Sequence, residues 1–275
     1  MSETINVIGA GLAGSIVTRL LRKHGFTVRV FDDKDPLAGS RASSNLYIAS
    51  WLKKFGSAEA ARGIEVLESI IPAEHIDQPF SRGIADALKV KHVAQKHVLV
   101  EPDHVGVARK CELSAGVETH DHFYPGRTIM CVGARDLNVE ILVGHCLLIP
   151  GRLPAGHSSL TMPLPYRHHK LYQFDENTIY FANSTALKRE SFEKRRVSLQ
   201  NDLVAQAAAA LKITPGELQN RLLEYRIGYR PIIPDKPFGQ LAELAPGVYS
   251  VNGGGKNGMV AYANLAAELL EKLKQ

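Results

Sequence analysis

Cysteine is scarce in this sequence: among 275 residues it occurs at Cys111, Cys131 and Cys146 alone. Because three is an odd number and no C-x-x-C spacing occurs, the pattern predicts neither a disulfide framework nor a cysteine metal site, and it favours a reducing compartment. Long hydrophobic runs are also missing, since no apolar stretch approaches the roughly eighteen residues of a membrane span. The first apolar run starts so close to Met1 that a signal peptide has no room. We therefore expect a soluble, cytoplasmic protein that does not enter a membrane.

A strong charge of either sign is lacking as well. The net charge of +5 is a mild basic bias, which tolerates an anionic partner without requiring one. Internal repeats and low-complexity linkers are absent, and the length allows one large domain or two smaller ones. The histidines predict no metal site: His120 and His122 would share one face of a strand, but no third ligand has a recognisable spacing.

The most specific motif that is present lies at the N-terminus. An apolar run over residues 4–8 enters the glycine pattern Gly9-Ala10-Gly11-Leu12-Ala13-Gly14. Gly9 permits a tight turn, Gly11 lets the backbone approach a pyrophosphate, and Gly14 lets a helix pack closely on the strand. A second apolar run over 26–31 ends at Asp32 and Asp33, where Asp32 would accept hydrogen bonds from a ribose. This pattern indicates a dinucleotide site and leaves NAD and FAD both open.

Two further stretches are candidates for the same site. The first is a polar loop, which can wrap cofactor phosphates with backbone N–H and hydroxyl groups or be an ordinary solvated loop: Ser40-Arg41-Ala42-Ser43-Ser44-Asn45. The second is the end of a short apolar run, Val132-Gly133-Ala134. Such a run is typical of a buried parallel strand, and ligands bind at the carboxyl ends of such strands.

Hydrophobic spacing and end signals predict the remaining elements. Helices are expected over 12–24, 46–71, 191–211, from Thr214 to near 225, and at the C-terminus. Strands are expected over 4–8, 26–31, within 84–101, over 128–132, over 139–149 with a break at Gly144, over 178–182 and over 248–251. Ser57 is expected to cap the second part of the helix over 46–71, and Thr214 and Glu217 form a capping-box pattern.

A second glycine-rich turn separates the last strand from the last helix. It reads Gly253-Gly254-Gly255-Lys256-Asn257-Gly258-Met259. A helix N-terminus at this point can stabilise the negative charge that collects on a reduced flavin. Upstream lies the sequence Gly228-Tyr229-Arg230-Pro231. Two glycine turns at opposite ends of the chain suit a long dinucleotide, which favours FAD.

With these motifs in this order, the sequence resembles the D-amino-acid oxidase and glycine oxidase family of FAD-dependent oxidoreductases. The resemblance covers both ends of the chain well and the middle loosely. It implies an α/β fold with a Rossmann-like FAD-binding domain formed by residues 1–45, 95–145 and 226–275. A small α+β substrate domain would be inserted as residues 46–94 and 146–225. Because family members usually exceed three hundred residues, we expect a reduced substrate domain and an open site.

The resemblance also implies a reaction, in which a hydride passes from the carbon next to an amine to flavin N5 and water hydrolyses the imine. In the family the arginine that matches Arg230 pairs with the substrate carboxylate, for which a planar guanidinium is well shaped. Lys256 and Asn257 would lie with Gly254 to Met259 along the flavin edge. The second carboxylate-binding group stays open, with Tyr166, Tyr172 and Tyr180 as candidates.

Three functions remain open at this point. The first is oxidation of a small amine or amino acid, with oxygen or a protein as electron acceptor. The second is the same oxidation of an amine or glycine carried on a modified base of tRNA or phage DNA, where basic residues would hold phosphates. The third is a flavoprotein or nicotinamide-binding subunit without catalysis. The sequence indicates no oligomeric state.

Overall fold

The computed structural model describes residues 4–33, 39–42, 46–47, 57–70, 76–82, 103–110, 120, 126–136, 138–152, 159–161, 169–183, 186–255 and 258–275. The chain divides into two compact units. The first consists of Met1–His75, Cys111–Leu142 and Gly228–Gln275, and the second of Ile76–Lys110 and Val143–Ile227. Each unit has its own hydrophobic core.

A five-stranded sheet with the order β13-β14-β6-β1-β2 forms the centre of the first unit. Its strands are β1 (Thr4–Ile8), β2 (Thr27–Phe31), β6 (Arg127–Met130), β13 (Gln240–Ala245) and β14 (Val248–Asn252). β2, β1, β6 and β14 run parallel, and β13 pairs antiparallel with β14 at the edge. Ile5 and Val7 of β1 are completely buried, as is typical of the central strand of a parallel sheet. The expected α/β class with a Rossmann-like parallel sheet is confirmed.

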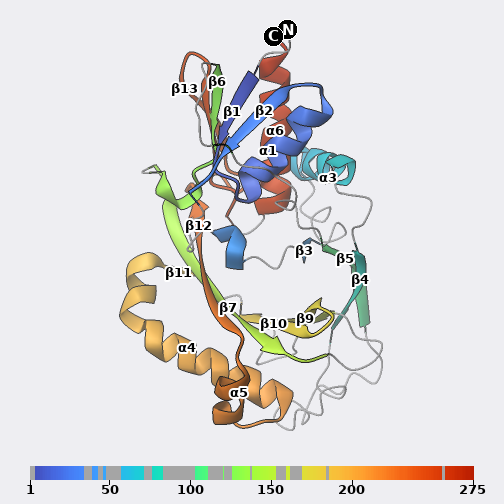
Figure 1. The fold of residues 1–275 in the computed structure, drawn as a ribbon, viewed down its shortest axis with the longest axis vertical. Coiled ribbons are helices and arrows are strands. Elements are labelled where there is room, and N and C mark those ends of the chain that lie inside the picture. Colours follow the sequence, from blue (N-terminus) through green and yellow to red (C-terminus); the bar gives the residue numbers. More distant parts are fainter. Residues whose placement is uncertain are drawn as a thin grey trace. The chain divides into compact units, whose positions relative to one another are not determined.

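Three helices pack on one another beside this sheet (Figure 1): α1 (Leu12–Lys23), α3 (Ala58–Ile70) and α6 (Gly258–Leu273). Their apolar stripes meet the strands in one core that includes Ile16, Leu67 and Leu269. α3 approaches α6 closely at Gly63, where a Cβ atom would overlap the carbonyl of Val260. The glycine therefore sets the distance between these two helices.

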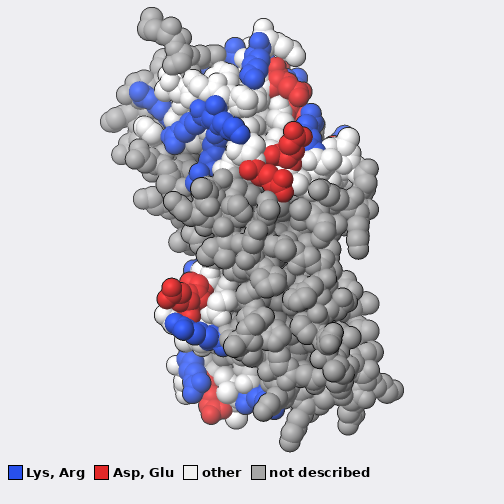
Figure 2. Space-filling view, turned by 90° about the vertical axis from the view of Figure 1, so that its right-hand side faces the viewer, with Lys and Arg blue, Asp and Glu red and all other residues white. Residues whose placement is uncertain are grey.

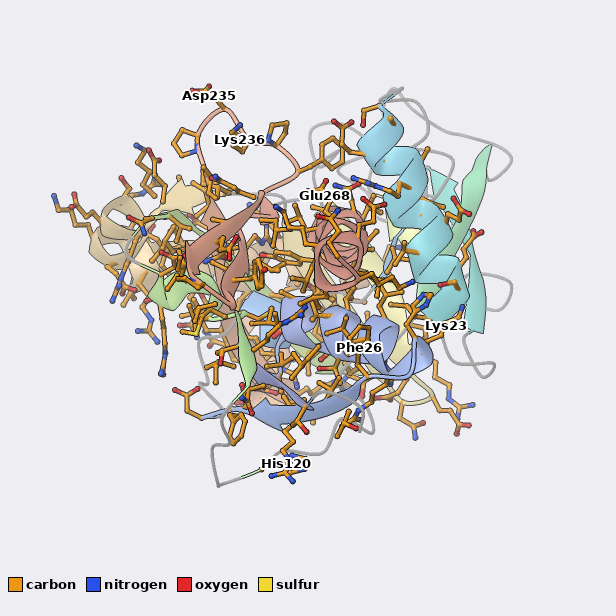
Figure 3. The ribbon with its side chains drawn as sticks, turned by 90° about the horizontal axis from the view of Figure 1, so that it is seen from above. Lys23, Phe26, His120, Asp235, Lys236 and Glu268 are labelled. Atoms are coloured by element: carbon orange, nitrogen blue, oxygen red, sulfur yellow. The ribbon has the colours of Figure 1, made fainter. Side chains whose placement is uncertain are left out.

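Basic side chains bind carbonyl groups at the ends of these helices. Lys23, at the end of α1, reaches α3 (Figure 3), where its ammonium donates to the carbonyl of Ser69 over 2.8 Å. The Arg127 guanidinium donates to the carbonyl of Leu273 over 2.9 Å. Positive charge at a helix C-terminus is favourable because the last carbonyls carry partial negative charge. By contrast, Asp235 and Lys236 project from an exposed turn (Figure 3).

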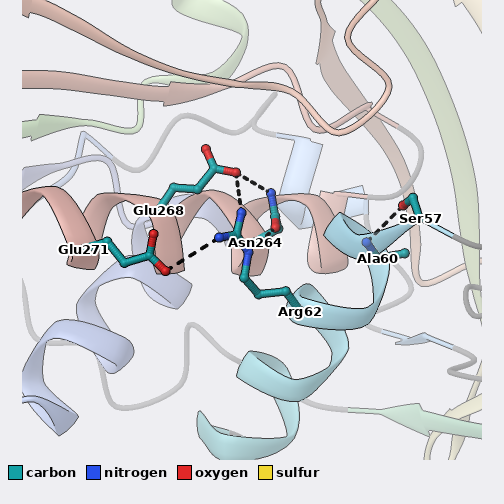
Figure 4. A network of polar contacts seen from close by, with 6 residues as sticks. All are labelled: Ser57, Ala60, Arg62, Asn264, Glu268 and Glu271. Atoms are coloured by element: carbon teal, nitrogen blue, oxygen red, sulfur yellow. Dashed lines mark hydrogen bonds and ion pairs between the residues drawn. The ribbon is translucent and has the colours of Figure 1, made fainter.

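Arg62 of α3 forms a polar cluster with Asn264, Glu268 and Glu271 of α6 (Figure 4). Arg62 donates through Nε to Asn264 Oδ1 over 2.7 Å and through Nη2 to Glu268 Oε1 over 2.6 Å. Asn264 in turn donates to Glu268 over 2.9 Å, and Glu271 lies 3.7 Å from the Arg62 guanidinium. Asn264 is 1% exposed, so the cluster satisfies an amide that would otherwise be buried at a cost.

The second unit contains a larger sheet. Its strands run in the order β11-β7-β10-β9-β8-β4-β5, and β12 also pairs with β7. The bounds are β4 (Ile76–Arg82), β5 (Asp103–Lys110), β7 (Glu140–Pro150), β8 (Ser159–Thr161), β9 (His169–Asp175), β10 (Thr178–Asn183), β11 (Leu187–Lys188) and β12 (Glu224–Ile232). The helices α4 (Arg189–Leu211) and α5 (Pro215–Arg221) share a core with β7 and β10 that includes Leu147, Phe181 and Leu203.

Several boundaries differ from the expectations. Residues Leu46–Tyr47 form the short strand β3, so the prediction of helix from residue 46 is wrong there. α3 begins after Ser57, whose hydroxyl accepts a hydrogen bond from the N–H of Ala60 over 3.1 Å. An apolar stripe alone does not separate a short strand from a helix, whereas the capping side chain marks the true start. The strands expected within 84–101 lie outside the described residues.

Other differences concern the middle and the end of the chain. β7 runs through Gly144, so the predicted break there is wrong; a glycine weakens a strand without having to end it. α5 ends at Arg221, and Tyr225 belongs to β12. α3 packs in the first unit, although it falls within the 46–94 segment expected in the substrate domain. The assignment of an FAD-binding and a substrate domain stays a prediction.

Candidate functional site

The N-terminal glycine turn has the shape that its sequence requires. Gly9 adopts φ +101°, and its N–H donates to the carbonyl of Phe31 over 2.6 Å. The N–H of Ala10 donates to Asp32 Oδ1 over 2.8 Å. A Cβ atom at Gly14 would overlap the carbonyl of Gly9, so α1 rests directly on the turn. Asp32, directly after β2, therefore helps to hold the glycine turn in place, in addition to any contact with a ribose.

The N-terminus of α1 is suited to bind an anion. Its N-cap is Gly11, no described side chain caps it, and its first turn carries no acidic residue. Ser15 donates its hydroxyl to the carbonyl of Ala10 over 2.9 Å and so faces the turn. Uncapped N–H groups and the positive end of the helix dipole together favour a phosphate at this position.

A short 3-10 helix, η1 (Gly39–Ala42), lies between this turn and β12. A Cβ atom at Gly11 would be 3.3 Å from Ser40 Oγ, so the start of the polar loop lies against the glycine turn.

The same 3-10 helix also packs against β12. Gly39 lies against the carbonyl of Tyr229, and a Cβ atom at Gly228 would be 2.7 Å from Ala42 Cβ. The first unit thus brings the glycine turn, the polar loop and the Gly228–Pro231 segment with Arg230 together.

A second turn follows β6. Cys131 donates its N–H to the carbonyl of Ile8 over 2.8 Å, and the chain then enters η2 (Gly133–Arg135). Gly133 adopts φ +58°, and a Cβ atom there would meet no described atom within 4 Å. Burial raises the pKa of the Cys131 thiol to about 12, so the sulfur is a neutral packing group at physiological pH. Arg135 forms an ion pair with Asp33, which links this turn to the end of β2.

The third turn follows β14. Gly253 and Gly255 have φ of +81° and +52°. The N–H of Gly253 donates to Asn252 Oδ1 over 2.8 Å, and the N–H of Gly254 donates to the Tyr262 hydroxyl over 3.3 Å. Burial raises the pKa of Tyr262, so its hydroxyl stays neutral. Because the N–H groups of Gly253 and Gly254 are bonded inside the protein, Gly255 is the better candidate to face a ligand among the described residues of this turn.

The starts of α1 and α6 are neighbours. A Cβ atom at Gly258 would be 3.4 Å from Leu12 Cδ2 and 3.3 Å from the Tyr262 ring. Ala13 and Met259 are buried in the core beneath them, so only their backbone groups are available to a ligand. Two helix N-termini therefore lie close together at one end of the sheet.

Asn252 and Tyr262 were missed by the sequence reasoning. Asn252 donates through Nδ2 to the carbonyl of Gly133 over 2.8 Å and to Asp136 Oδ2 over 3.2 Å. It is 2% exposed and joins the turn after β6 to the turn after β14. The available signal was a polar residue that ends an apolar strand directly before glycines. No local signal identified Tyr262, which lies eight residues after its partner Gly254.

Some expected site residues lie outside the described part of the chain: Ser43, Ser44, Asn45, Lys256 and Asn257. The side chain of Arg41 lies outside it too. Of the tyrosine candidates for a second carboxylate contact, Tyr180 is buried beside Phe174 in the second unit. Within the described residues, no three His, Cys, Asp or Glu side chains are grouped to hold a metal ion, and no helix has the length and apolar character to cross a membrane.

Comparisons with known proteins agree with this geometry. Residues 7–56 match the family described as an NAD(P)-binding Rossmann-like domain. Kynurenine 3-monooxygenase of Saccharomyces cerevisiae is 38% identical over 81 residues, which is 28% of this chain and 16% of that protein. This match spans a small part of the yeast protein, so that protein's activity is not carried over to this chain.

Solved structures match over the whole chain. The iminodiacetate oxidase of Chelativorans sp. BNC1 aligns with a TM-score of 0.64 at 16% identity, covering 98% of this chain and 95% of that one. The glycine oxidase of Geobacillus kaustophilus aligns with a TM-score of 0.60 at 12% identity and the same coverage. At these identities the likeness concerns the fold. The resemblance in fold to glycine oxidase, expected from the sequence, is confirmed.

Proposed function

We propose that this protein is an FAD-dependent oxidoreductase that oxidises the C–N bond of an amine or a glycine-like amino acid. The observation that carries the proposal is the position of η1, which contacts both the Gly11 turn and the backbone of Gly228 and Tyr229. The residues expected to hold a diphosphate and the arginine expected to hold a carboxylate are therefore neighbours in one unit. The fold shared with iminodiacetate oxidase and glycine oxidase supports the same reading.

The described residues fit FAD. The uncapped N-terminus of α1 would take the diphosphate, and the space beside Gly133 leaves room for a ligand against the carboxyl end of β6. Asp32 would bind a ribose while it holds Ala10 in place. The α6 N-terminus would place positive potential near the ring system. Bound FAD would supply the acceptor for the hydride that leaves the substrate carbon.

Arg230 has the role of anchoring the substrate carboxylate. It is half-buried on β12, next to the residue that packs on η1. A guanidinium can hold both oxygens of a carboxylate in a fixed plane, which orients the adjacent C–H bond. A lysine at this position would keep the charge and lose the two-point contact.

The test is an anaerobic titration of the purified protein followed by its visible spectrum. Glycine, sarcosine and iminodiacetate are the probes, and we expect at least one of them to bleach the bound flavin. R230A should raise KM for that carboxylate by about thirtyfold or more, since it would remove the charged partner proposed for the substrate carboxylate. R195A, on the exposed start of α4, is the control and should leave KM unchanged. A protein without flavin, or a flavin that no amine bleaches, contradicts the proposal.

The alternative substrate is an amine carried on nucleic acid. Its support is the net charge of +5. On the face shown in Figure 2, however, acidic side chains accompany the basic ones among the described residues, which favours a free amine. A nucleic-acid substrate predicts binding that weakens with salt in proportion to the phosphates contacted. Absence of DNA and RNA binding at low salt would exclude it.

A further inference from the structure

The turns after β6 and β14 lie next to each other because these strands are parallel neighbours. The last paired residues are Met130 and Ser250. Gly133 follows three residues after the first of these and Gly253 three residues after the second. Asn252 therefore stands between two glycine turns that belong to chain segments about 120 residues apart, as its contact with Gly133 shows.

Both the nitrogen and the oxygen of the Asn252 side-chain amide form hydrogen bonds. Nδ2 donates to the Gly133 carbonyl over 2.8 Å and to Asp136 Oδ2 over 3.2 Å, while Oδ1 accepts from the Gly253 N–H over 2.8 Å. Two of these partners belong to the turn after β6 and one to the turn after β14. A planar amide with three hydrogen bonds fixes the separation and the tilt of the two turns at once.

We propose that Asn252 is a positioning residue for the cofactor: it holds the two turns in the arrangement that FAD requires, so the affinity for FAD depends on its amide. This inference rests on the proposed function in that FAD is the ligand. Asn252 is buried behind the turns and acts through their backbone. Asn252 would act on the cofactor through the backbone of Gly133 and Gly253. Both glycines have a positive φ, which strains most other residues.

The experiment compares N252D with N264D. In N252D the new carboxylate can still accept from Gly253, but its other oxygen faces the Gly133 carbonyl and the Asp136 carboxylate, which repel it. N264D is the matched control, because it also places a carboxylate at a buried asparagine beside an acid, Glu268, in the same unit. Its hydrogen-bond partners, Arg62 and Glu268, belong to α3 and α6 and to neither of the two turns (Figure 4).

Three quantities are measured for each variant: the FAD dissociation constant by flavin fluorescence, the visible spectrum of the bound flavin, and the melting temperature of the apoprotein. We expect N252D to weaken FAD binding about tenfold or more, because both hydrogen bonds that Asn252 Nδ2 donates are lost, and to alter the flavin spectrum. N264D should lower the melting temperature and leave both flavin readouts unchanged. In N252D/D136N the amide at residue 136 can donate to the carboxylate at residue 252, so this variant should recover part of the lost affinity; the repulsion from the Gly133 carbonyl remains.

D136A provides a second variant in case N252D does not fold. It removes one of the three hydrogen-bond partners of Asn252 at a half-buried position, together with an exposed hydrogen bond from the Asn138 N–H, and should weaken FAD binding by about threefold. Wild-type FAD affinity in N252D, or in D136A where N252D does not fold, would overturn the inference and leave the proposed function standing. A wild-type protein that binds no FAD would contradict the proposed function and the inference with it.

Discussion

Some glycines of this chain leave no room for a side chain, whereas others could be replaced. At Gly14 a Cβ atom would overlap the carbonyl of Gly9, because α1 rests on the turn there. At Gly216, in the first turn of α5, a Cβ atom would meet nothing within 4 Å, and the backbone is not left-handed. Close packing therefore requires glycine at position 14. Among the described residues, nothing requires glycine at position 216.

We expect G14A to lower the free energy of unfolding by about 2 kcal/mol through overpacking and to abolish FAD binding. G216A is the control, with a gain of up to about 1 kcal/mol because alanine is the better helix former. Urea denaturation measures both values, and an FAD titration measures the binding. Wild-type affinity in G14A would show that the turn does not depend on the close contact of helix and strand.

Tyr225 gives a pH-dependent prediction for the second unit. Its hydroxyl lies 2.9 Å from Nδ1 of the buried His145. Burial raises the pKa of Tyr225 to about 12 from an ordinary 10; nearby Cys146 and Glu193 also raise it, and Arg196 opposes them. Between these two values the unfolded chain loses the proton first, so stability is full below about pH 10 and falls as the pH approaches 12.

Chemical denaturation from pH 9 to pH 12, followed by a probe in the second unit, checks this expectation. Y225F should remove the part of the decline that belongs to this phenol. Other tyrosines also titrate in this range, so the comparison is between the slopes of the variant and the wild type. An identical slope would mean that the hydroxyl of Tyr225 is no more protected in the folded protein than in the unfolded one.

Local chemistry decides where α5 begins. The Thr214 hydroxyl accepts from the N–H of Glu217 over 3.2 Å, and the Glu217 carboxylate accepts from the N–H of Thr214 over 2.7 Å. The Thr214 N–H, and after it the Thr214 hydroxyl that donates to Glu217 Oε2 over 2.8 Å, lower the pKa of the Glu217 carboxyl. A lowered carboxylate pKa contributes stability above the ordinary Glu value and loses it as the pH falls.

T214A should therefore cost about 1 kcal/mol at neutral pH, the typical effect of losing an N-cap. This loss of stability should become smaller at acidic pH, because a protonated Glu217 is a weaker acceptor for the hydrogen bonds of the capping box. S198A, at an exposed position inside α4, is the control and should change stability by about 0.5 kcal/mol or less. Urea titrations at pH 7 and pH 3 measure the difference; an equal cost at both would exclude the carboxylate from the cap.

The two units have separate cores, so a ligand of the first should stabilise them unequally. FAD at a hundred times its dissociation constant should stabilise the first unit by about 2.7 kcal/mol. Peptide-resolved hydrogen exchange should show slower exchange in α1 and α6 and unchanged exchange in α4. Equal protection of α4 would show that the units unfold together, and no protection anywhere would place the ligand elsewhere.

Short-range chemistry in the sequence predicted the parts of the fold that depend on neighbouring residues. The glycine turn after β1 and the capping box of α5 each need contacts within a few positions of the chain. Backbone sterics and capping hydrogen bonds act at that range, so residue type and spacing suffice. The parallel strands followed from their continuous apolar runs.

The tertiary structure alone decided how those pieces meet. Only the fold shows that α3 belongs beside α6, that η1 lies between Gly11 and Tyr229, and that Asn252 joins two turns across the sheet. Such contacts depend on the register of strands and the packing of helices far apart in the chain, which no local pattern encodes. The sequence by itself determined a dinucleotide-binding turn, and the packing of the first unit determined which residues surround it.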